Sequence, residues 1–149
     1  MTSVNDLSGR PAGPWQEHVA GLLGQALRRL REEILAASDE HFPGLRVSHY
    51  RLLELIPTDG ARITDLAEVA VMTKQGLGQH VDYLQGLGYA ESDRLRGDRR
   101  VRLVRRTSRG EEAVAFSRAA IERVEALWAE QLGPERFEEF LETLRVIGR

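Results

Sequence analysis

The strongest hydrophobic pattern in the chain lies between residues 63 and 88, where apolar positions recur at the spacing of two successive helices. The first set is Ile63, Leu66, Ala67 and Ala70, and the second is Leu77, Val81, Leu84 and Gly88. At about 100° per residue, Gln75, Gln79 and Asp82 point away from the second apolar face. The pattern predicts a short helix that supports a longer helix, and the longer helix keeps a polar face free for contacts.

Beyond residue 88 the pattern changes to two strands joined by a basic tip. Val101 and Leu103 alternate with Arg100 and Arg102, as the two faces of a half-buried strand do. We predict strands over residues 89–93 and 100–104, with residues 95–99 as the tip. Residues 93–109 contain eight arginines and two aspartates, a charge of +6, so the remainder of this chain of net charge −2 carries −8.

An exposed polar helix beside a cationic hairpin favours binding to duplex DNA. A helix fits the major groove, and arginines contact phosphates or enter the minor groove. A basic run is often only a solvated surface, but a basic tip on an acidic body favours docking through one face.

Long apolar stripes flank this segment on both sides. The first stripe is Trp15, Val19, Leu22, Leu23, Ala26, Leu27, Leu30 and Ile34. A second, Val114, Ile121, Val124, Leu127 and Trp128, is followed by a third, Phe137, Phe140, Leu141, Leu144 and Ile147. The first stripe is too long for a helix that covers one small domain, so we predict that part of it is a subunit interface.

Polar residues mark where several helices begin. Ser48, Thr64 and Thr73 are each predicted to cap a helix, and Pro57 ends the helix that starts near Ser48. The longer helix also contains Gly76, Gly78 and Gly86, and each glycine costs about 1 kcal/mol relative to alanine. Close packing against another helix and close approach to a phosphate backbone both remain as explanations.

The segment from residue 63 to residue 110 resembles the winged helix-turn-helix of the MarR family of bacterial transcription regulators. The shared motifs are ITDLAE at 63–68, TKQxLxQxVDxL at 73–84, LGY at 87–89, GDRR at 97–100 and RTSRG at 106–110. At the last of these the family usually has Leu-Thr-x-x-Gly. The chain departs from the family at Val71, where glycine is common between the two helices, so we expect the turn angle to differ.

The resemblance implies a mainly α fold with a small β-wing, in which N- and C-terminal dimerisation helices flank the winged helix-turn-helix. The expected parts are a flexible arm at 1–14, a dimerisation helix at 15–40, the DNA-binding domain at 45–107 and dimerisation helices at 108–149. The implied function is that of a homodimeric repressor, without a cofactor, that binds a pseudo-palindromic operator in double-stranded DNA.

Two groups of residues are candidates for DNA contacts. On the longer helix they are Thr73, Lys74, Gln75 and Gln79, because glutamine pairs bidentately with adenine and Lys74 is the single lysine of the chain. In the wing they are Arg94, Arg96, Arg99 and Arg100, which suit a narrow minor groove. Asp98 would repel phosphate. In the family this aspartate pairs with a wing arginine, so the resemblance implies that Asp98 and Arg100 shape the wing.

Family members often bind a small aromatic or anionic molecule between the dimerisation helices and the winged domain. The residues that the resemblance suggests for such an effector pocket are Trp15, His18, Arg46, His49 and Tyr50. Packing and surface roles are the alternative for each of them, and a packing role is the better interpretation of His80.

Other classes of function find little support in the sequence. Cysteine is absent, the four histidines show no metal-ligand spacing, and no nucleophile elbow or phosphate-binding glycine loop occurs, so we expect neither a metal site nor an enzyme. The first 14 residues have no apolar core, and no later stretch approaches the ~20 apolar residues of a membrane span, so we expect a cytoplasmic protein. The main alternative is a winged domain that contacts proteins and has lost DNA binding, for which four wing arginines would be unnecessary.

Overall fold

The computed structural model describes residues 15–36 and 38–149, so the arm predicted at residues 1–14 lies outside the described part of the chain. The elements, in order, are η1 (Trp15–Glu17), α1 (Val19–Leu35), α2 (Ser38–His41), α3 (Val47–Leu55), β1 (Ala61–Arg62), α4 (Ile63–Ala70), α5 (Lys74–Gly86), β2 (Ala90–Leu95), β3 (Asp98–Arg106), α6 (Ser108–Leu132) and α7 (Pro134–Ile147). The three strands form one antiparallel sheet in the order β1-β3-β2. The predicted fold class, mainly α with a small β-wing, is confirmed.

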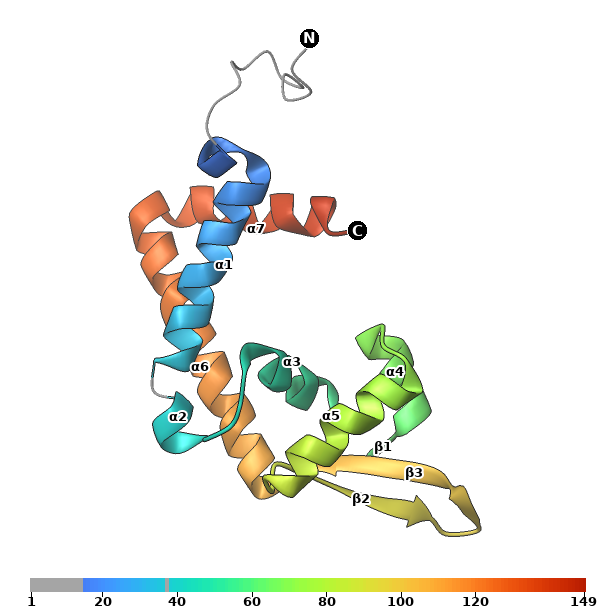
Figure 1. The fold of residues 1–149 in the computed structure, drawn as a ribbon. Helices are drawn as coiled ribbons and strands as arrows, with labels where there is room; N and C mark the ends of the chain where they lie inside the picture. Colours follow the sequence, from blue (N-terminus) through green and yellow to red (C-terminus); the bar gives the residue numbers. More distant parts are fainter. Residues whose placement is uncertain (1–14, 37) are drawn as a thin grey trace.

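The long helix α6 joins two parts of the molecule (Figure 1). At one end α1 packs alongside α6, and α7 leaves the end of α6 at a steep angle. At the other end lie α3, α4, α5 and the sheet, from which β2 and β3 project as a hairpin. The two helices of the helix-turn-helix and the hairpin therefore share one end of the molecule, away from the first and last helices.

The core of the winged part is formed by one face of α3, one face of α5 and the end of β3. Its fully buried side chains include Leu53, Ile56, Leu77, Val81, Leu84 and Val104. Burying one such aliphatic side chain stabilises the fold by about 1.5–3 kcal/mol, so the apolar face of α5 fixes the rotation of that helix. The spacing predicted this face, except that Gly88 lies beyond the helix in a turn with φ of +83°.

The junction between β3 and α6 explains the Thr-Ser-Arg-Gly sequence found there. The Thr107 hydroxyl accepts the N–H of Gly110 at 3.1 Å and donates to the carbonyl of Gly88 at 2.6 Å, so it caps α6 and ties it to the end of α5. A Cβ atom at Gly110 would lie 2.1 Å from the carbonyl oxygen of Tyr89, so only glycine fits where α6 crosses the backbone.

The dimerisation helix predicted at residues 15–40 differs in extent from the helices observed. The chain forms η1, then α1, which ends at Leu35, and then the short α2. Ser38 is fully buried, and its hydroxyl oxygen lies 2.5 Å from the Tyr50 hydroxyl oxygen. Phe42 is buried as well. The chain therefore turns from the exposed α1 into the core after Leu35, which a continuous exposed helix would not allow.

Two of the three predicted caps are wrong. α3 begins one residue after Arg46, whose N–H is accepted by His49 Nδ1 at 3.0 Å, so Ser48 lies within the first turn and the helix start is held by a histidine of that turn. α4 is preceded by Arg62 in extended conformation, and Thr64 lies within its first turn. Thr73 caps α5 as predicted. Serine and threonine are accepted inside a first helical turn as well as before it, so residue type alone did not fix the start.

Much of the apolar stripe predicted on the first helix is exposed. Val19 is 73% and Leu27 is 50% exposed, and Ile147 at the end of α7 is 69% exposed. Within α1 the buried residue is Ile34. Large apolar side chains on α1 and α7 thus have no cover from the described part of the chain. None of the helices formed by residues 15–36 and 38–149 is long and apolar enough to span a membrane.

Candidate nucleic-acid interface

The N-terminal half of α5 presents a polar surface to solvent. The Thr73 hydroxyl accepts the N–H of Gly76 at 3.0 Å and so starts the helix. Lys74, Gln75 and Gln79 are exposed, while Leu77 on the opposite face is fully buried. The four residues predicted to contact DNA from this helix therefore lie at its exposed start, and Thr73 is also the cap.

The wing is a tight hairpin, shorter at its tip than predicted. β2 extends to Leu95 and β3 begins at Asp98, which leaves Arg96 and Gly97 as the connection. Gly97 has φ of +99°, a conformation that a β-branched or bulky residue rarely adopts. The ladder is irregular between Arg94 and Leu95. This places Arg94, Arg96 and Arg99 around the end of the hairpin.

Four of the eight arginines in residues 93–109 have partners within the chain. Arg102 Nη2 lies 2.7 Å from Asp82 Oδ1, and Arg105 contacts Glu91 at 2.7 Å and Asp93 at 2.5 Å. Arg106 contacts Glu111 at 2.9 Å and donates to the carbonyl of Leu53 at 3.2 Å. The guanidinium of Arg109 lies over the rings of Phe42 and Tyr89, at 5.7 Å and 5.4 Å from their centroids. The side chains of these four arginines are therefore already held by groups of the same chain.

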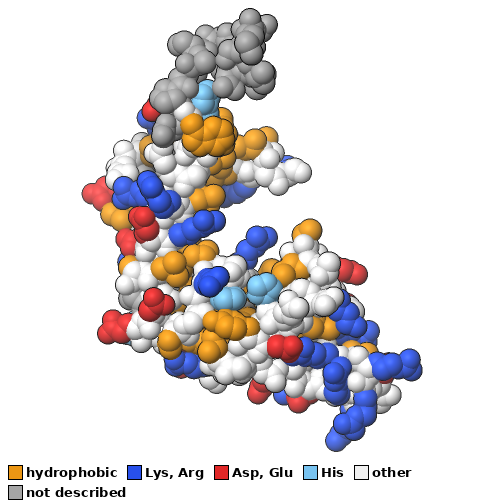
Figure 2. Space-filling model, in the orientation of Figure 1, with side chains coloured by type: hydrophobic (Ala, Val, Ile, Leu, Met, Phe, Trp, Pro, Cys, Tyr) orange, Lys and Arg blue, Asp and Glu red, His pale blue; other side chains and the backbone are white. Residues whose placement is uncertain are grey.

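The other four arginines are the wing residues predicted to contact DNA. Arg94, Arg96 and Arg99 are exposed and form no ion pair with a carboxylate in the described residues. Arg100 is 95% exposed at its side chain and lies 3.6 Å from Asp98. Figure 2 shows a group of basic side chains at the hairpin end of the molecule. A positive surface of this kind attracts a polyanion.

Asp98 and Arg100 contact each other, as expected for residues that shape the wing. Asp98 Oδ1 accepts the backbone N–H of Arg100 at 3.1 Å and lies 3.6 Å from its Nε. The side-chain pair is exposed, so its Coulombic attraction is screened by water and salt. The hydrogen bond to the backbone is therefore the stronger constraint on the turn.

The ion pair between Arg102 and Asp82 was missed in the sequence. The spacing placed Asp82 on the free polar face of α5, whereas its carboxylate holds an arginine from β3. Arg102 Nε also donates to the hydroxyl of Ser92 at 3.1 Å, and its side chain is only 17% exposed. These contacts join the helix to both wing strands. No local pattern indicates a partner 20 positions away.

The turn between α4 and α5 carries an unusual backbone conformation at Val71. This residue has φ of 54° and ψ of 49°, in the left-handed region, and its side chain is 88% exposed. The N–H of Met72 bonds to the carbonyl of Ala67 at 2.9 Å and closes the turn. A β-branched residue is strained in this region, which glycine enters freely, so the turn keeps the left-handed geometry despite the valine.

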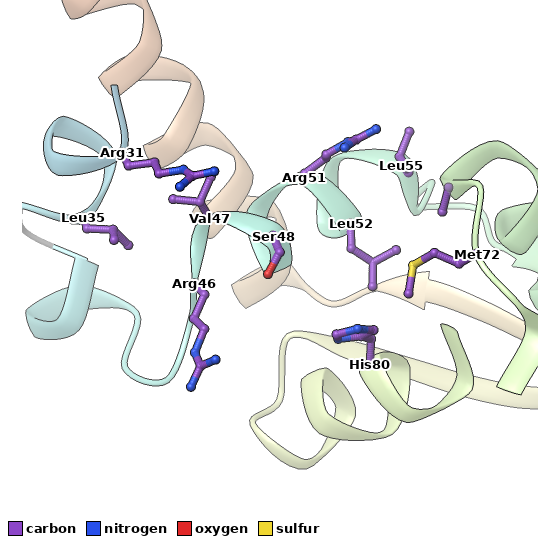
Figure 3. Close-up of a pocket in the computed structure, with 11 residues that line it drawn as sticks. Arg31, Leu35, Arg46, Val47, Ser48, Arg51, Leu52, Leu55, Met72 and His80 are labelled. Carbon is purple, nitrogen blue, oxygen red and sulfur yellow. The ribbon is translucent and has the colours of Figure 1, made fainter. Parts of the chain in front are cut away.

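A cavity of about 670 Å³ lies between α1 and the helix-turn-helix. The residues that line it come from α1, from α3 and the residue before it, from the end of α4 and the turn after it, and from α5 (Figure 3). They are Arg31, Leu35, Arg46, Val47, Ser48, Arg51, Leu52, Leu55, Ala70, Met72 and His80. Of the five residues predicted for an effector pocket, Arg46 lines this cavity. His80, for which packing was the preferred interpretation, lines it as well.

The other four predicted pocket residues lie elsewhere. Tyr50 is buried against Ser38, and burial raises the pKa of its hydroxyl. His49 is buried with its ring stacked on Tyr83, 4.9 Å between centroids. Burial lowers the pKa of His49, and the nearby His80 and Arg46 lower it further. The fold therefore uses both residues for packing, as the alternative interpretation held.

Trp15 and His18 lie at the start of the described chain, near the far end of α1. Trp15 lines a separate, smaller cavity of about 250 Å³ beside Arg28. The five predicted residues thus do not form one pocket. No group of three or more His, Asp or Glu residues in the described ranges is arranged to hold a metal ion.

No protein-family model matches the chain, and no curated protein does either. Solved structures match over most of its length. The transcriptional repressor CouR bound to a 23-mer DNA duplex has a TM-score of 0.72 and 23% identity, over 94% of this chain and 100% of that one. CouR from Rhodococcus jostii RHA1 bound to p-coumaroyl-CoA has a TM-score of 0.65 and 19% identity, over 89% and 92%.

A third structure is that of Sco3205, a MarR family transcriptional regulator from Streptomyces coelicolor, in complex with DNA. It has a TM-score of 0.67 and 20% identity, over 93% of this chain and 89% of that one. The likeness covers the flanking helices as well as the wing. The chain therefore has the winged-helix fold of the MarR family transcription regulators, as its sequence motifs predicted.

Proposed function

We propose that this protein is a sequence-specific DNA-binding transcription regulator. The observation that carries the proposal is the exposed polar start of α5 beside four wing arginines, of which three have no carboxylate partner among the described residues. The CouR and Sco3205 structures with bound DNA support it, because this chain shares their fold. We propose no catalytic activity.

Each candidate residue has a distinct role in the proposed complex. Gln75 and Gln79 would read base edges in the major groove, since glutamine pairs bidentately with adenine. Lys74 would contact phosphate, and the Thr73 hydroxyl, which accepts from Gly76, keeps its own hydrogen for a phosphate oxygen. The wing residues Arg94, Arg96, Arg99 and Arg100 would follow the neighbouring minor groove.

We further propose that the protein acts as a homodimer. The exposed apolar residues of α1 and α7, such as Val19, Leu27 and Ile147, need a cover, and a second copy supplies a matching surface through two-fold symmetry. The symmetry would place two recognition helices about 34 Å apart, in successive major grooves of a pseudo-palindromic operator. A dimer over a promoter would exclude polymerase, so repression is the mode we propose.

The cavity beside α1 offers a route for regulation by a small ligand. It is lined by Arg31 of α1, by Leu52 of α3 and by His80 of α5, so a bound molecule would contact the dimerisation helix and the recognition helix at once. A ligand that binds better to one arrangement of these helices shifts the population toward it and changes the affinity for DNA. The CouR structure with p-coumaroyl-CoA supports a ligand-controlled regulator.

The first experiment compares binding of the purified protein to the intergenic DNA upstream of its own gene and to random duplex, across a salt series. We expect a preference of at least ~10³-fold for the specific duplex and a steep loss of affinity with salt. Weak, equal binding would call for a selection from genomic fragments to find the operator. Absence of binding in both tests would favour the alternative of a protein-contact module.

A further inference from the structure

The C-terminal half of α5 has a third face, which is neither the buried face nor the polar face proposed to contact DNA. On this face His80, Tyr83 and Leu87 follow one another at the spacing of one side of a helix. Tyr83 and Leu87 are 46% and 38% exposed, so the face lies at the surface of the molecule. It lies beside residues 42–46, the segment that leads from α2 into α3 (Figure 1).

The hydroxyl and the ring of Tyr83 are both held by residues 44–49. The hydroxyl donates to the carbonyl of Gly44 at 2.8 Å. The ring stacks on that of His49, with 4.9 Å between the centroids and 27° between the planes. His49 is fixed in turn, because its Nδ1 accepts the N–H of Arg46 at 3.0 Å. A side chain that is nearly half exposed therefore makes two directional contacts with one part of the chain.

Gly44 allows the close approach on which these contacts depend. Its φ of +85° lies in the region that favours glycine. A Cβ atom at this position would lie 2.9 Å from Leu87 Cδ1 and 3.2 Å from the Tyr83 hydroxyl oxygen. The side chains at positions 83 and 87 thus pack directly against the backbone of the segment, and a larger residue at position 44 would push them away.

Residues 42–46 connect the two parts of the molecule on which the proposed function depends. They follow α1 and α2, and they precede α3 of the winged part. The buried face of α5 fixes the rotation of that helix, and Tyr83 adds a fixed point on the connection to α1. In a symmetric dimer two such points influence how far apart the recognition helices lie, and the half-sites of an operator must match that distance.

We propose that Tyr83 is a positioning residue, which holds the recognition helix α5 in place and so sets the half-site spacing that the dimer accepts. The proposal rests on the DNA binding and the homodimer proposed above. Half-sites at another spacing are bound only if α5 moves relative to residues 44–49, and the two contacts of Tyr83 resist that movement. Phosphate contacts with a random duplex need no fixed spacing, so they should not depend on Tyr83.

The test is Tyr83→Phe, which keeps a ring to stack on His49 and removes the hydroxyl that bonds to Gly44. Affinity is measured for the operator and for the same duplex with one base pair inserted between the half-sites, which separates them by about 3.4 Å more and rotates them by about 35°. We expect the insertion to weaken binding by wild type, and to weaken binding by Tyr83→Phe about two- to tenfold less, the equivalent of one hydrogen bond. Affinity for random duplex should be unchanged. An insertion that costs wild type nothing, or equal penalties in the two proteins, would overturn the proposal.

Two further variants separate positioning from a general loss of stability. Tyr83→Leu also removes the ring stack, so its insertion penalty should be smaller still. Tyr50→Phe is the matched control, because it loses a buried tyrosine hydroxyl that lies 2.5 Å from the hydroxyl of Ser38 and does not contact α5. It should lower the midpoint of urea unfolding and keep the wild-type insertion penalty. A reduced penalty in Tyr50→Phe would show that any loosening of the fold changes the accepted spacing, and would overturn the role of Tyr83.

Hydrogen exchange of the free protein tests the contacts of Tyr83 without DNA. In Tyr83→Phe we expect faster amide exchange than in wild type over residues 43–49 and 80–87, and unchanged exchange in α6 and α7. Unchanged exchange in both segments would overturn the proposal. A protein that bound no operator would fail the proposed function and would still answer this test. Conversely, tight operator binding by Tyr83→Phe with the wild-type exchange and insertion penalty would leave the DNA-binding proposal intact and remove the role of Tyr83.

Discussion

Arg102 Nη2 lies 2.7 Å from Asp82 Oδ1, and this ion pair joins the wing to the helix proposed to enter the major groove. The hydroxyl of Ser92, on β2, accepts from Arg102 Nε at 3.1 Å, so one guanidinium on β3 links three elements. The spacing between helix and wing determines which groove each reaches on a duplex. The pair therefore fixes a geometric property on which the proposed function depends.

We predict that Arg102 and Asp82 are energetically coupled. A double-mutant cycle with Arg102→Gln and Asp82→Asn should give a coupling of about 0.5–1 kcal/mol in the free energy of unfolding. The ratio of specific to random DNA affinity should fall in both single variants, because helix and wing lose their fixed spacing. The cycle on Arg145 and Glu142, an exposed pair on α7, is the control and should show weaker coupling. Additive effects of the two substitutions would contradict the proposed link.

Substitutions of the interface glutamines should change base preference, whereas substitutions of the wing arginines should change the overall affinity for DNA. Gln75→Ala or Gln79→Ala should cost about 1–3 kcal/mol on the specific duplex and relax the preference at particular base pairs. Arg96→Ala should weaken specific and random binding alike and reduce the salt slope by about one. The control is Gln131→Ala, an exposed glutamine on α6. Equal losses on both duplexes for the glutamine variants would rule out base reading.

Val71→Gly should stabilise the protein. The left-handed conformation costs an L residue about 1–2 kcal/mol, while glycine loses about 0.5–1 kcal/mol more backbone entropy on folding, so we expect a net gain of up to about 1.5 kcal/mol. Urea unfolding measures it. Val69→Gly, at an exposed position two residues earlier within α4, is the control and should destabilise by roughly 0.3–0.5 kcal/mol, because valine is itself a weaker helix former than alanine. A loss in both variants would show that Val71 is not strained.

Two glycine substitutions should have opposite effects. Gly110→Ala places a Cβ atom 2.1 Å from the carbonyl oxygen of Tyr89, so we expect at least about 3 kcal/mol of destabilisation or failure to fold. Gly86→Ala meets no atom within 4 Å and should stabilise α5 by up to about 1 kcal/mol. The same contacts bear on why α5 contains glycines, for which close packing and close approach to a phosphate backbone were both left as explanations. Packing within the described chain does not require Gly86, and Gly78 has only an ordinary contact at 3.8 Å with Ile63.

The sequence predicted those features that depend on local pattern. Apolar spacing identified the buried face of α5, and the cap at Thr73 was predicted because its hydroxyl directly precedes that helix. Which arginines are exposed and which have partners within the chain was also predictable in part. The candidates Arg94, Arg96 and Arg99 lie near the hairpin tip, where few carboxylates can reach them.

Features that depend on distant partners could not be predicted. Tyr50 was assigned to a pocket, but its hydroxyl lies 2.5 Å from that of Ser38, a contact created by the turn after α1. His80 lines the cavity because of the angle between α5 and α3, which no spacing encodes. Arg31 and Arg51 were absent from the predicted pocket for the same reason: that they line one cavity is visible only once the helices are placed.

His49 should make the stability of the protein sensitive to acid. Its Nδ1 accepts the N–H of Arg46 at 3.0 Å, which requires the neutral ring, and burial, followed by His80 and Arg46, lowers its pKa. As pH falls below about 6.5, the unfolded chain takes up a proton at this residue and the folded chain does not. The contribution of His49 to the free energy of unfolding should therefore have its full value above this pH. It should decrease as the solution becomes more acidic, until the pKa of His49 in the folded protein is reached.

The measurement is urea unfolding of wild type and His49→Asn at several pH values between about 5 and 8. Asparagine retains an oxygen close to the position of Nδ1, so it can accept the same backbone N–H but does not titrate. The slopes of stability against pH are compared, because loss of the stack on Tyr83 lowers the stability of the variant at every pH. We expect a shallower slope below about pH 6.5 in His49→Asn, and identical slopes would assign the acid sensitivity to other groups.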